Sequence, residues 1–257
     1  MRVAICGRNL NDLRGYLAGF PAQICQHDPE IVISYGGDGA LLGAERDFPG
    51  VPKCPIRDRR STPKCSAHGE SAILQMLFDG TLPVSTLTKV QAVKDGELKA
   101  VGLNDIVISR RKLSSAVRYR IWLDEERYAS QVVGDGPVVA TPFGSTGYYR
   151  SITHSLFRLG IGLAFNNSTE PIDHLVLDES TRITAEILRG PAVLFADNDP
   201  QQTFLEAGDR VEITRTDERA TILGLDVFRC AQCYALRQSR EDPSRGPRDL
   251  HKKAILS

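Results

Sequence analysis

The sequence predicts an open α/β domain of the Rossmann-like kind, followed by an all-β domain of the sandwich type. In residues 1–82, strand-like and helix-like segments alternate, which is typical of a parallel sheet covered by helices. In residues 83–229, strand-like segments follow one another with few helical patterns between them. We therefore expect two domains with these boundaries. Residues 230–257 would form a C-terminal segment with a mobile end.

The α/β half is predicted from hydrophobic periodicity. Residues 2–6 and 30–35 are short apolar, β-branched runs, which are typical of strands. Leu10, Leu13 and Leu17 recur between them at helical spacing. Two further helices are expected at residues 40–45 and 70–78.

The β-rich half is predicted from alternation and turn residues. Apolar side chains alternate with polar ones along residues 117–123, and Asp95-Gly96 is a hairpin-type turn. Other strands are expected at residues 84–93, 102–109, 127–133, 183–188, 192–196, 210–214 and 220–225.

Composition and charge exclude several classes of protein. The chain has 257 residues, of which 41% are hydrophobic and 25% charged, which is ordinary for a globular protein. Its 32 Lys and Arg balance 32 Asp and Glu, so no overall positive field would gather nucleic acid or an anionic membrane. No apolar run approaches the roughly 20 residues of a membrane helix, and residues 1–6 predict a strand rather than a signal peptide. We expect a cytoplasmic protein that recognises small molecules.

The first chemical motif is Gly36-Gly37-Asp38-Gly39, which lies between a predicted strand and a predicted helix. This order places backbone N–H groups and a helix N-terminus where phosphate oxygens can dock. Asp38 could position a hydroxyl group, accept its proton or hold a magnesium ion. The four residues alone fit a plain turn equally well, and neither a P-loop nor a G-x-G-x-x-G motif occurs in the chain.

Two more motifs lie in the β-rich half. In residues 133–148, a strand between two glycine-containing turns would present Asp135 at one end and Ser145, Thr146 and Tyr148 at the other. In residues 102–108, Asn104-Asp105 interrupts an apolar run. Each motif alone also fits an ordinary turn or sandwich loop. Ser145 does not lie in a G-x-S-x-G elbow, which excludes a serine hydrolase of that kind.

In order and spacing, GGDGALL, GLND and GDGPVVATPFGSTGYYRS resemble the three diagnostic blocks of the NAD kinase family, over about residues 1 to 230. The resemblance implies transfer of a phosphoryl group from ATP, or from polyphosphate, to the 2′-hydroxyl of the adenosine ribose of NAD, which gives NADP. It also implies that the reaction needs Mg²⁺ or another divalent cation, although it assigns no residue as a metal ligand. The family pattern further implies a homodimer or homotetramer, and a C-terminal segment, residues 230–257, that partly returns to the first domain.

The same resemblance implies a role for individual residues. Asp38 would engage and deprotonate the hydroxyl group. The phosphates would be bound by Gly36, Gly37 and Gly39, and the adenosine portion by Asn104 and Asp105. The nicotinamide end would be bound by Asp135, and the rest of the nucleotide by Thr146, Gly147, Tyr148 and Ser151.

Some segments depart from the family pattern. Residues 54–64 lack the expected glycine- and asparagine-containing turn, and their basic residues, Arg57, Arg59, Arg60 and Lys64, would form either a phosphate clamp or a solvated charge run. Residues 163–169 replace a block containing proline, histidine and serine, and Asp197-Asn198 replaces an Asp-Gly pair. Two alternative functions follow: a non-catalytic NAD(P)-binding homologue, or a related GGDG kinase with another acceptor, such as a lipid.

The six cysteines are too few for a disulfide scaffold and are interpreted as reduced thiols. Cys230 and Cys233 form the only C-x-x-C pair, to which Cys54 and Cys65 could add two zinc ligands if the fold brought all four together. Ordinary buried or surface thiols are the alternative.

Overall fold

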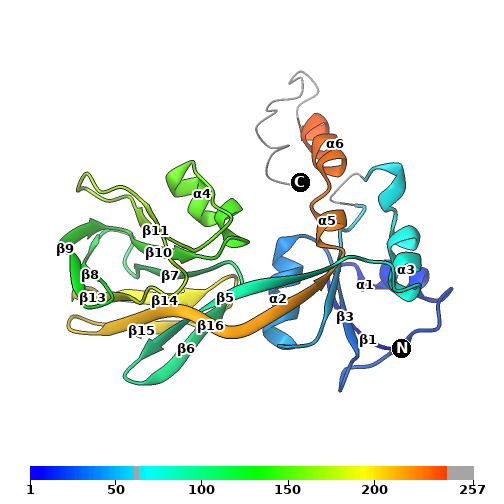
Figure 1. Ribbon diagram of the computed structural model, residues 1–257, viewed down its shortest axis with the longest axis horizontal. Coiled ribbons are helices and arrows are strands. Elements are labelled where there is room, and N and C mark those ends of the chain that lie inside the picture. Colours follow the sequence, from blue (N-terminus) through cyan, green and yellow to red (C-terminus); the bar gives the residue numbers. More distant parts are fainter. Residues whose placement is uncertain (61–63, 242–257) are drawn as a thin grey trace. The chain divides into compact units, whose positions relative to one another are not determined.

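The computed structural model describes residues 1–60 and 64–241, with side chains as far as residue 236. The chain forms two compact units (Figure 1): one contains Met1–Thr86 and the residues from Ala220 onward, and the other contains Leu87–Arg219. Each unit has its own hydrophobic core. The domain boundaries at residues 82 and 229 stay predictions.

The first unit is built on a parallel sheet. Its strands lie in the order β2 (Gln23–Ile24), β1 (Arg2–Gly7), β3 (Ile31–Tyr35) and β4 (Lys53–Ile56), and all neighbouring pairs are parallel. The end of the long strand β16 (Arg210–Leu223) continues this sheet beside β4, with Ile222 opposite Lys53. The chain first adds β2 on one side of β1 and then β3 on the other, so the strand order reverses between β1 and β3.

Helices cover both faces of this sheet. Helices α1 (Leu10–Leu17) and α3 (Glu70–Phe78) pack their buried leucine and isoleucine side chains on one face, against Val3, Ile33 and Ile56. Helix α2 (Asp38–Asp47) packs Ala44 on the other face, against Ala4 and Val32. A sheet buried on both faces explains why its strands are apolar along most of their length. The predicted open α/β arrangement is confirmed.

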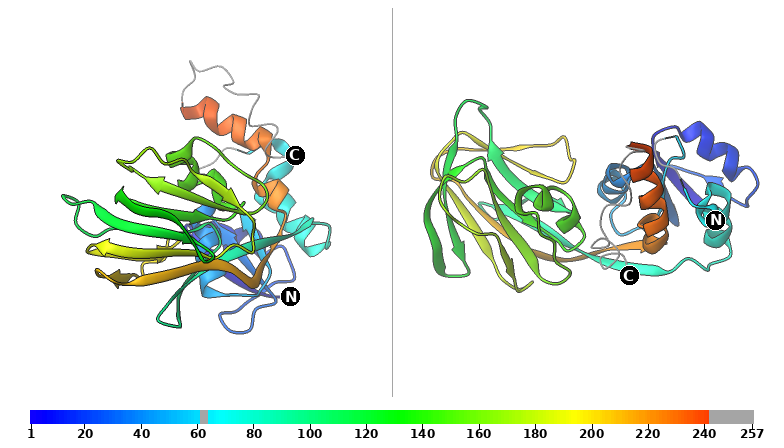
Figure 2. Two further views of the ribbon diagram at one scale, coloured as in Figure 1. Left: turned by 60° about the vertical axis from the view of Figure 1, so that its left-hand side comes forward. Right: turned by 90° about the horizontal axis from the view of Figure 1, so that it is seen from above.

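The second unit is an antiparallel sandwich, whose two sheets are visible in Figure 2. Large apolar side chains from both sheets, including Ile121, Val139 and Ile183, form one core between them. The predicted sandwich is therefore confirmed. One sheet has the order β9 (Glu126–Gly134), β8 (Val117–Leu123), β13 (Ile183–Arg189) and β16, with the hairpin of β5 (Val84–Lys94) and β6 (Glu97–Gly102) attached. The other has the order β12 (Leu175–Leu177), β11 (Ile161–Asn166), β10 (Gly136–Ala140), β7 (Asp105–Arg110), β14 (Ala192–Ala196) and β15 (Thr203–Leu205).

The structure differs from the predicted elements near the C-terminus. The two strands expected at residues 210–214 and 220–225 are one continuous strand, β16, whose polar middle resembles a turn in the sequence. After it come the short helix α5 (Leu225–Phe228) and helix α6 (Ala231–Glu241), which is rich in good helix-forming residues. The predicted mobile end lies outside the described residues.

Short helical segments complete the fold. They are two 3-10 turns, η1 (Ser66–His68) and η2 (Gly144–Thr146), and helix α4 (Tyr148–Thr153). In the part of the chain that the structure describes, no helix is both long enough and apolar enough to span a membrane.

Candidate functional site

In the first unit, the predicted phosphate loop lies at the carboxyl edge of the parallel sheet. Gly36 follows the last residue of β3, and its backbone N–H donates a 2.9 Å hydrogen bond to the carbonyl of Ile56, at the end of β4. Ligands of open α/β sheets bind at this edge, beside the position where the strand order reverses. The fold therefore places the glycine loop where such sheets bind nucleotides.

The glycine loop makes a sharp turn into helix α2. Gly36 has a φ of 152°, and a Cβ atom there would lie 3.0 Å from the Cβ of Ala40. A larger residue would therefore be strained and crowded. Gly37 is the N-cap of α2 and Asp38 is its first residue, so the loop lies at the positive end of the helix dipole. Gly39 lies in the same turn.

The carboxylate of Asp38 lies beside Arg57. Half of the Asp38 side chain is exposed, and its Oδ1 is 3.5 Å from Nη2 of Arg57. Arg57 is itself held in place, because its Nε donates a 3.0 Å hydrogen bond to the carbonyl of Phe228 and its guanidinium stacks 3.9 Å above the Phe228 ring. A cation is thus fixed next to the proposed catalytic carboxylate.

Arg229 adds a second positive charge to this region. Burial lowers its pKa, and the charges of Asp38 and Arg57 also act on it. The charge of Arg229 in this region was not predicted, since Arg229 is far from Asp38 in the sequence and belongs to no recognised motif.

The predicted phosphate clamp is only partly assembled, because three of its four basic residues are engaged elsewhere. Arg59 donates a 2.7 Å hydrogen bond to the Tyr16 hydroxyl, and Nη2 of Arg60 is 2.8 Å from the Asp12 carboxylate. Lys64 forms a 2.7 Å ion pair with Glu70. Only Arg57 lies at the glycine loop, so the hypothesis of a four-residue cluster is wrong.

In the second unit, the structure brings Asn104 against the turn that begins at Gly144. A Cβ atom on Gly144 would lie 2.0 Å from the carbonyl oxygen of Asn104, so only glycine fits there. The same carbonyl accepts a 2.8 Å hydrogen bond from the N–H of Thr141. The Asn104 amide lies close to Gly147 as well, since its Nδ2 is 3.7 Å from the position of a Cβ on that residue. The second and third sequence motifs thus form one surface.

Asp105 is a buried carboxyl group next to another, Asp197. Burial, reinforced by the charge of Asp197, raises the pKa of Asp105 to about 7. Burial also raises the pKa of Asp197, but its carboxylate accepts hydrogen bonds from the backbone N–H groups of Leu103, Asn104 and Asp105. These bonds favour the ionised form of Asp197 and oppose the effect of its burial, whereas a pKa of about 7 leaves a large share of Asp105 protonated near neutral pH.

Asp135 and Tyr148 are joined through two asparagines. Oδ1 of Asp135 is 2.8 Å from Nε of Arg110, and its Oδ2 accepts a 2.6 Å hydrogen bond from Asn167. Asn166 donates a 2.7 Å hydrogen bond to the hydroxyl of Tyr148, whose side chain is 39% exposed. The segment that departs from the family pattern therefore contributes directly to this surface.

The remaining predicted site residues lie on η2 and α4. Their hydroxyl groups bond locally: Thr146 donates to the carbonyl of Phe143 at 3.4 Å, and Ser151 donates to the carbonyl of Tyr148 at 2.7 Å. Ser145 is buried and its hydroxyl is directed at the backbone carbonyls of Pro142 and Phe157, which agrees with the exclusion of a serine nucleophile.

Comparisons with known proteins identify relatives of the chain and of its fold. It is 30% identical over 227 residues to the NAD kinase of Burkholderia multivorans, covering 82% of this chain and 74% of that protein. It is 28% identical over 214 residues to the NAD kinase of Clostridium perfringens, covering 77% of this chain and 75% of that protein. None of the protein-family models scanned matches the chain.

Two solved structures share the fold. One is an NAD kinase from Archaeoglobus fulgidus in complex with ATP, with a TM-score of 0.74 and 17% identity, covering 93% of this chain and 99% of that chain. The other is the yeast NADH kinase complexed with NADH, with a TM-score of 0.78 and 15% identity, covering 97% of this chain and 90% of that chain.

Proposed function

Because this chain belongs to the NAD kinase family, we propose that it transfers the terminal phosphoryl group of ATP to the 2′-hydroxyl of the adenosine ribose of NAD, which gives NADP. The observation that carries this proposal is the position of Asp38. It is a half-exposed carboxylate at the N-terminus of α2, within a glycine loop at the carboxyl edge of the sheet.

In this reaction Asp38 acts on the acceptor hydroxyl. One of its carboxylate oxygens accepts a hydrogen bond from the 2′-hydroxyl and takes its proton as the ribose oxygen bonds to the phosphorus. The bond between that phosphorus and the leaving oxygen of ADP breaks in the same step. Arg57 holds Asp38 through its ion pair and so orients the carboxylate.

The transferred phosphoryl group carries negative charge that must be balanced. The N-terminus of α2 and the guanidinium groups of Arg57 and Arg229 supply partially positive and positive charge in this region. Because such transfer depends on positioning and electrostatic stabilisation, a fixed set of charges around one carboxylate is suited to it.

A divalent cation such as Mg²⁺ fits this loop. Asp38 offers an exposed carboxylate oxygen, and magnesium is usually bound by one or two carboxylates together with substrate phosphates. When bound, the ion would neutralise charge on the donor phosphates.

The second unit supplies the nucleotide-binding residues in this proposal. Asn104 and the protonated Asp105 would bind the adenosine portion, since an amide and a neutral carboxyl group each offer both a donor and an acceptor. Asp135 would bind the nicotinamide end. Thr146, Gly147, Tyr148 and Ser151 would line the rest of the nucleotide, with the exposed Tyr148 ring as a wall.

Two further expectations are carried over as proposals: a homodimer or homotetramer, from the family resemblance, and a cytoplasmic location, from the sequence. Light scattering coupled to size-exclusion chromatography tests the first. The expected mass is two or four times the 28.3 kDa of a single chain.

Transfer of labelled phosphate from ATP tests the choice of acceptor. Purified protein with Mg²⁺ is offered NAD, NADH, diacylglycerol and a sphingoid base in separate reactions. Label in NADP, or in NADPH, supports the proposal, and label in a lipid contradicts it. Saturable NAD binding with no label in any product would instead make the chain a non-catalytic dinucleotide-binding protein.

A further inference from the structure

A group of four metal-ligating side chains lies in the first unit, apart from the glycine loop. Cys65, His68, Cys230 and Cys233 each present one ligand atom, and all four atoms lie within 4.8 Å of one another. Two residues separate Cys65 from His68, and two residues separate Cys230 from Cys233. This spacing is common to the ligand pairs of structural zinc sites. The sequence signal for this group was C-x-x-C together with C-x-x-H.

The predicted ligand set is corrected in one position. Cys65 does lie beside the C-x-x-C pair, but Cys54 is fully buried in strand β4 and belongs to the hydrophobic core. His68, at the end of η1, completes the group in its place.

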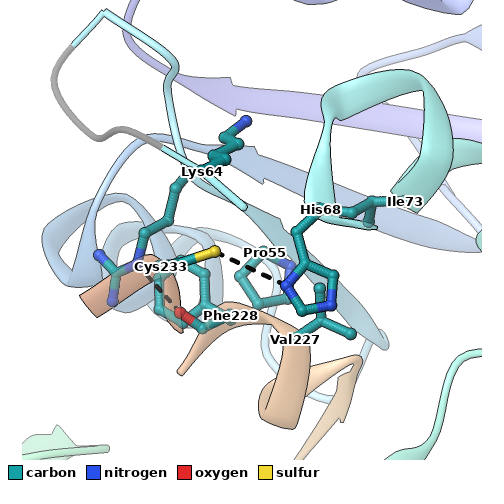
Figure 3. A pocket seen from close by; sticks show the side chains of 8 residues that line it. Pro55, Lys64, His68, Ile73, Val227, Phe228 and Cys233 are labelled. Carbon is teal, nitrogen blue, oxygen red and sulfur yellow. Dashed lines mark hydrogen bonds between the residues drawn. The ribbon is translucent and has the colours of Figure 1, made fainter. Parts of the chain in front are cut away.

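The distances among three of the four ligand atoms are close to those of a tetrahedral zinc site. The Sγ atoms of Cys65 and Cys233 are 3.6 Å apart, and Nδ1 of His68 is 3.3 Å from the first and 3.6 Å from the second. A tetrahedral zinc ion with bonds of about 2.3 Å to sulfur and about 2.0 Å to nitrogen separates its ligand atoms by roughly 3.5 to 3.8 Å. Figure 3 shows the His68 ring turned towards the sulfur of Cys233.

The surroundings of the group also suit a bound cation. The backbone N–H of Cys65 is directed at Sγ of Cys233 over 3.3 Å, which is the kind of bond that stabilises a metal-bound thiolate. A small cavity borders His68 and Cys233, and the rest of its lining is partly apolar and partly basic (Figure 3): Pro55, Ile73, Val227, Phe228, Arg57 and Lys64. The two cations offset the negative charge of several thiolates.

Other chemistries fit this arrangement less well. All six cysteines are free thiols, and the Sγ atoms of Cys65 and Cys233 are 3.6 Å apart, whereas a disulfide bond is about 2.05 Å long. Hard cations such as Mg²⁺ and Ca²⁺ require oxygen ligands, whereas thiolates with an imidazole select zinc. The ligand atoms are also too close together to enclose an iron–sulfur cluster, which leaves room for a single ion.

We propose that Cys65, His68, Cys230 and Cys233 bind one structural Zn²⁺ ion. All four coordination positions are filled by protein atoms, so the site is of the closed, structural kind. The ion joins the turn before α3 to the start of α6, two segments 168 positions apart at Cys65 and Cys233.

This position links the ion to the glycine loop through the chain itself. Cys230 follows Arg229 directly and lies two residues after Phe228, whose carbonyl and ring hold Arg57. Fixing Cys230 therefore fixes the segment that holds the cation beside Asp38.

The metal content of the full chain tests the proposal. The protein is expressed without a metal-binding affinity tag in medium containing zinc, and its metals are measured by inductively coupled plasma mass spectrometry. We expect about one zinc ion per wild-type chain and at least about a tenfold lower content in Cys230→Ser and in His68→Ala. Cys25→Ser is the matched control, since Cys25 lies outside the group, and it should keep the wild-type content.

A spectroscopic measurement on the wild-type protein does not depend on whether the variants fold. Replacement of zinc by Co²⁺ should give the intense visible absorption of a tetrahedral cobalt site together with a thiolate-to-cobalt charge-transfer band. Wild-type protein that contains no zinc and gives no such spectrum overturns the proposal. So does a disulfide among Cys65, Cys230 and Cys233 in the native protein. Both readouts are independent of NADP formation, so the site and the proposed kinase activity can fail separately.

Discussion

At the scale of single residues, Arg57 connects three features of the glycine loop. It pairs with Asp38, donates to the carbonyl of Phe228 and stacks on the Phe228 ring. A guanidinium can make all three contacts because it is planar and has donors on several edges, whereas an ammonium group cannot. The position therefore requires arginine and not simply a positive charge.

We predict that Arg57→Ala lowers kcat/KM for NADP formation about 100-fold, because it removes a fixed charge from the developing transition state. Arg57→Lys should recover only part of this loss. Steady-state kinetics with varied ATP and NAD measure both effects, and Arg59→Ala is the control because Arg59 contacts Tyr16 instead. Equal activity of Arg57→Ala and the wild type would contradict this role.

Asp105 should make the stability of the protein depend on pH. Its pKa is raised from 3.8 to about 7, so the folded state holds a proton that the unfolded state releases. The stabilisation is full below pH 3.8 and is lost as the pH rises through about 7. The asparagine of Asp105→Asn does not titrate, so this variant lacks the loss of stability that the wild type shows between pH 5 and pH 8. The free energy of unfolding of the variant minus that of the wild type should therefore be about 2–3 kcal/mol larger at pH 8 than at pH 5.

Urea unfolding at the two pH values measures this difference. Asp217→Asn is the control, because the Asp217 side chain is fully exposed and its replacement should leave the wild-type pH dependence unchanged. If the difference in free energy of unfolding between Asp105→Asn and the wild type is the same at both pH values, Asp105 is ionised in the folded protein at both and the prediction is wrong.

The residues of the site differ in how far the sequence could identify them. Asp38, Asn104 and Asp135 lie in motifs with recognisable order and spacing. The partners that orient them, among them Arg57 and Asn167, come from other segments of the chain, and only the fold brings them into contact. Residues that act through such contacts leave no local pattern in a single sequence.

At the scale of elements, helix α2 presents Asp38 and is anchored by a buried ion pair. Glu45 on α2 pairs with Lys53 on β4, with 3% and 0% of their side chains exposed, and Lys53 also donates to the carbonyl of Phe48 at 2.7 Å. Opposite charges in such a place are stable only together, because either one alone would be buried without its partner.

We predict that Glu45→Ala lowers the free energy of unfolding by about 3–5 kcal/mol, since it leaves Lys53 buried and unneutralised. The double variant Glu45→Leu, Lys53→Met should regain most of this loss. Urea unfolding of both proteins checks the prediction. A loss of less than about 1 kcal/mol in the single variant would mean that water reaches Lys53.

The turn at Gly144 gives a second test at this scale. Gly144→Ala should lower stability by about 1–3 kcal/mol and weaken NAD binding, because its Cβ would overlap the Asn104 carbonyl at 2.0 Å. Gly15→Ala is the matched control. Gly15 is in helix α1 with no atom within 4 Å of the added carbon, so this change should be neutral or stabilising. Thermal unfolding and NAD titration of the two variants distinguish these outcomes.

Elements with clear periodicity were predictable, and those that depend on tertiary contacts were not. The helix at Glu70–Phe78 and the strand at Val117–Leu123 carry regular apolar patterns and form as expected. Strand β16 was divided in the prediction because residues 215–219 are polar, yet they continue the strand. Residues 65–68 have no apolar periodicity, so the 3-10 turn that ends at His68 was not predicted.

At the scale of the whole molecule, each unit supplies a different part of the proposed reaction. In this proposal the first would present Asp38 and the charges for phosphate, and the second would bind the rest of the nucleotide. The fold class was predictable because alternation of strands and helices and succession of strands are patterns of whole segments. The four ligands of the proposed zinc site were not all predictable, since a sequence does not show which distant pairs meet.

The measurement that tests the account most directly is NADP formation by the purified full chain with NAD, ATP and Mg²⁺, beside Asp38→Asn. The wild type should form NADP, and Asp38→Asn should be at least about 100-fold slower while it still binds NAD. Wild-type protein that binds NAD but forms no NADP above the blank, or Asp38→Asn that reacts at the wild-type rate, would contradict the assignment of Asp38 as the catalytic base of an NAD kinase.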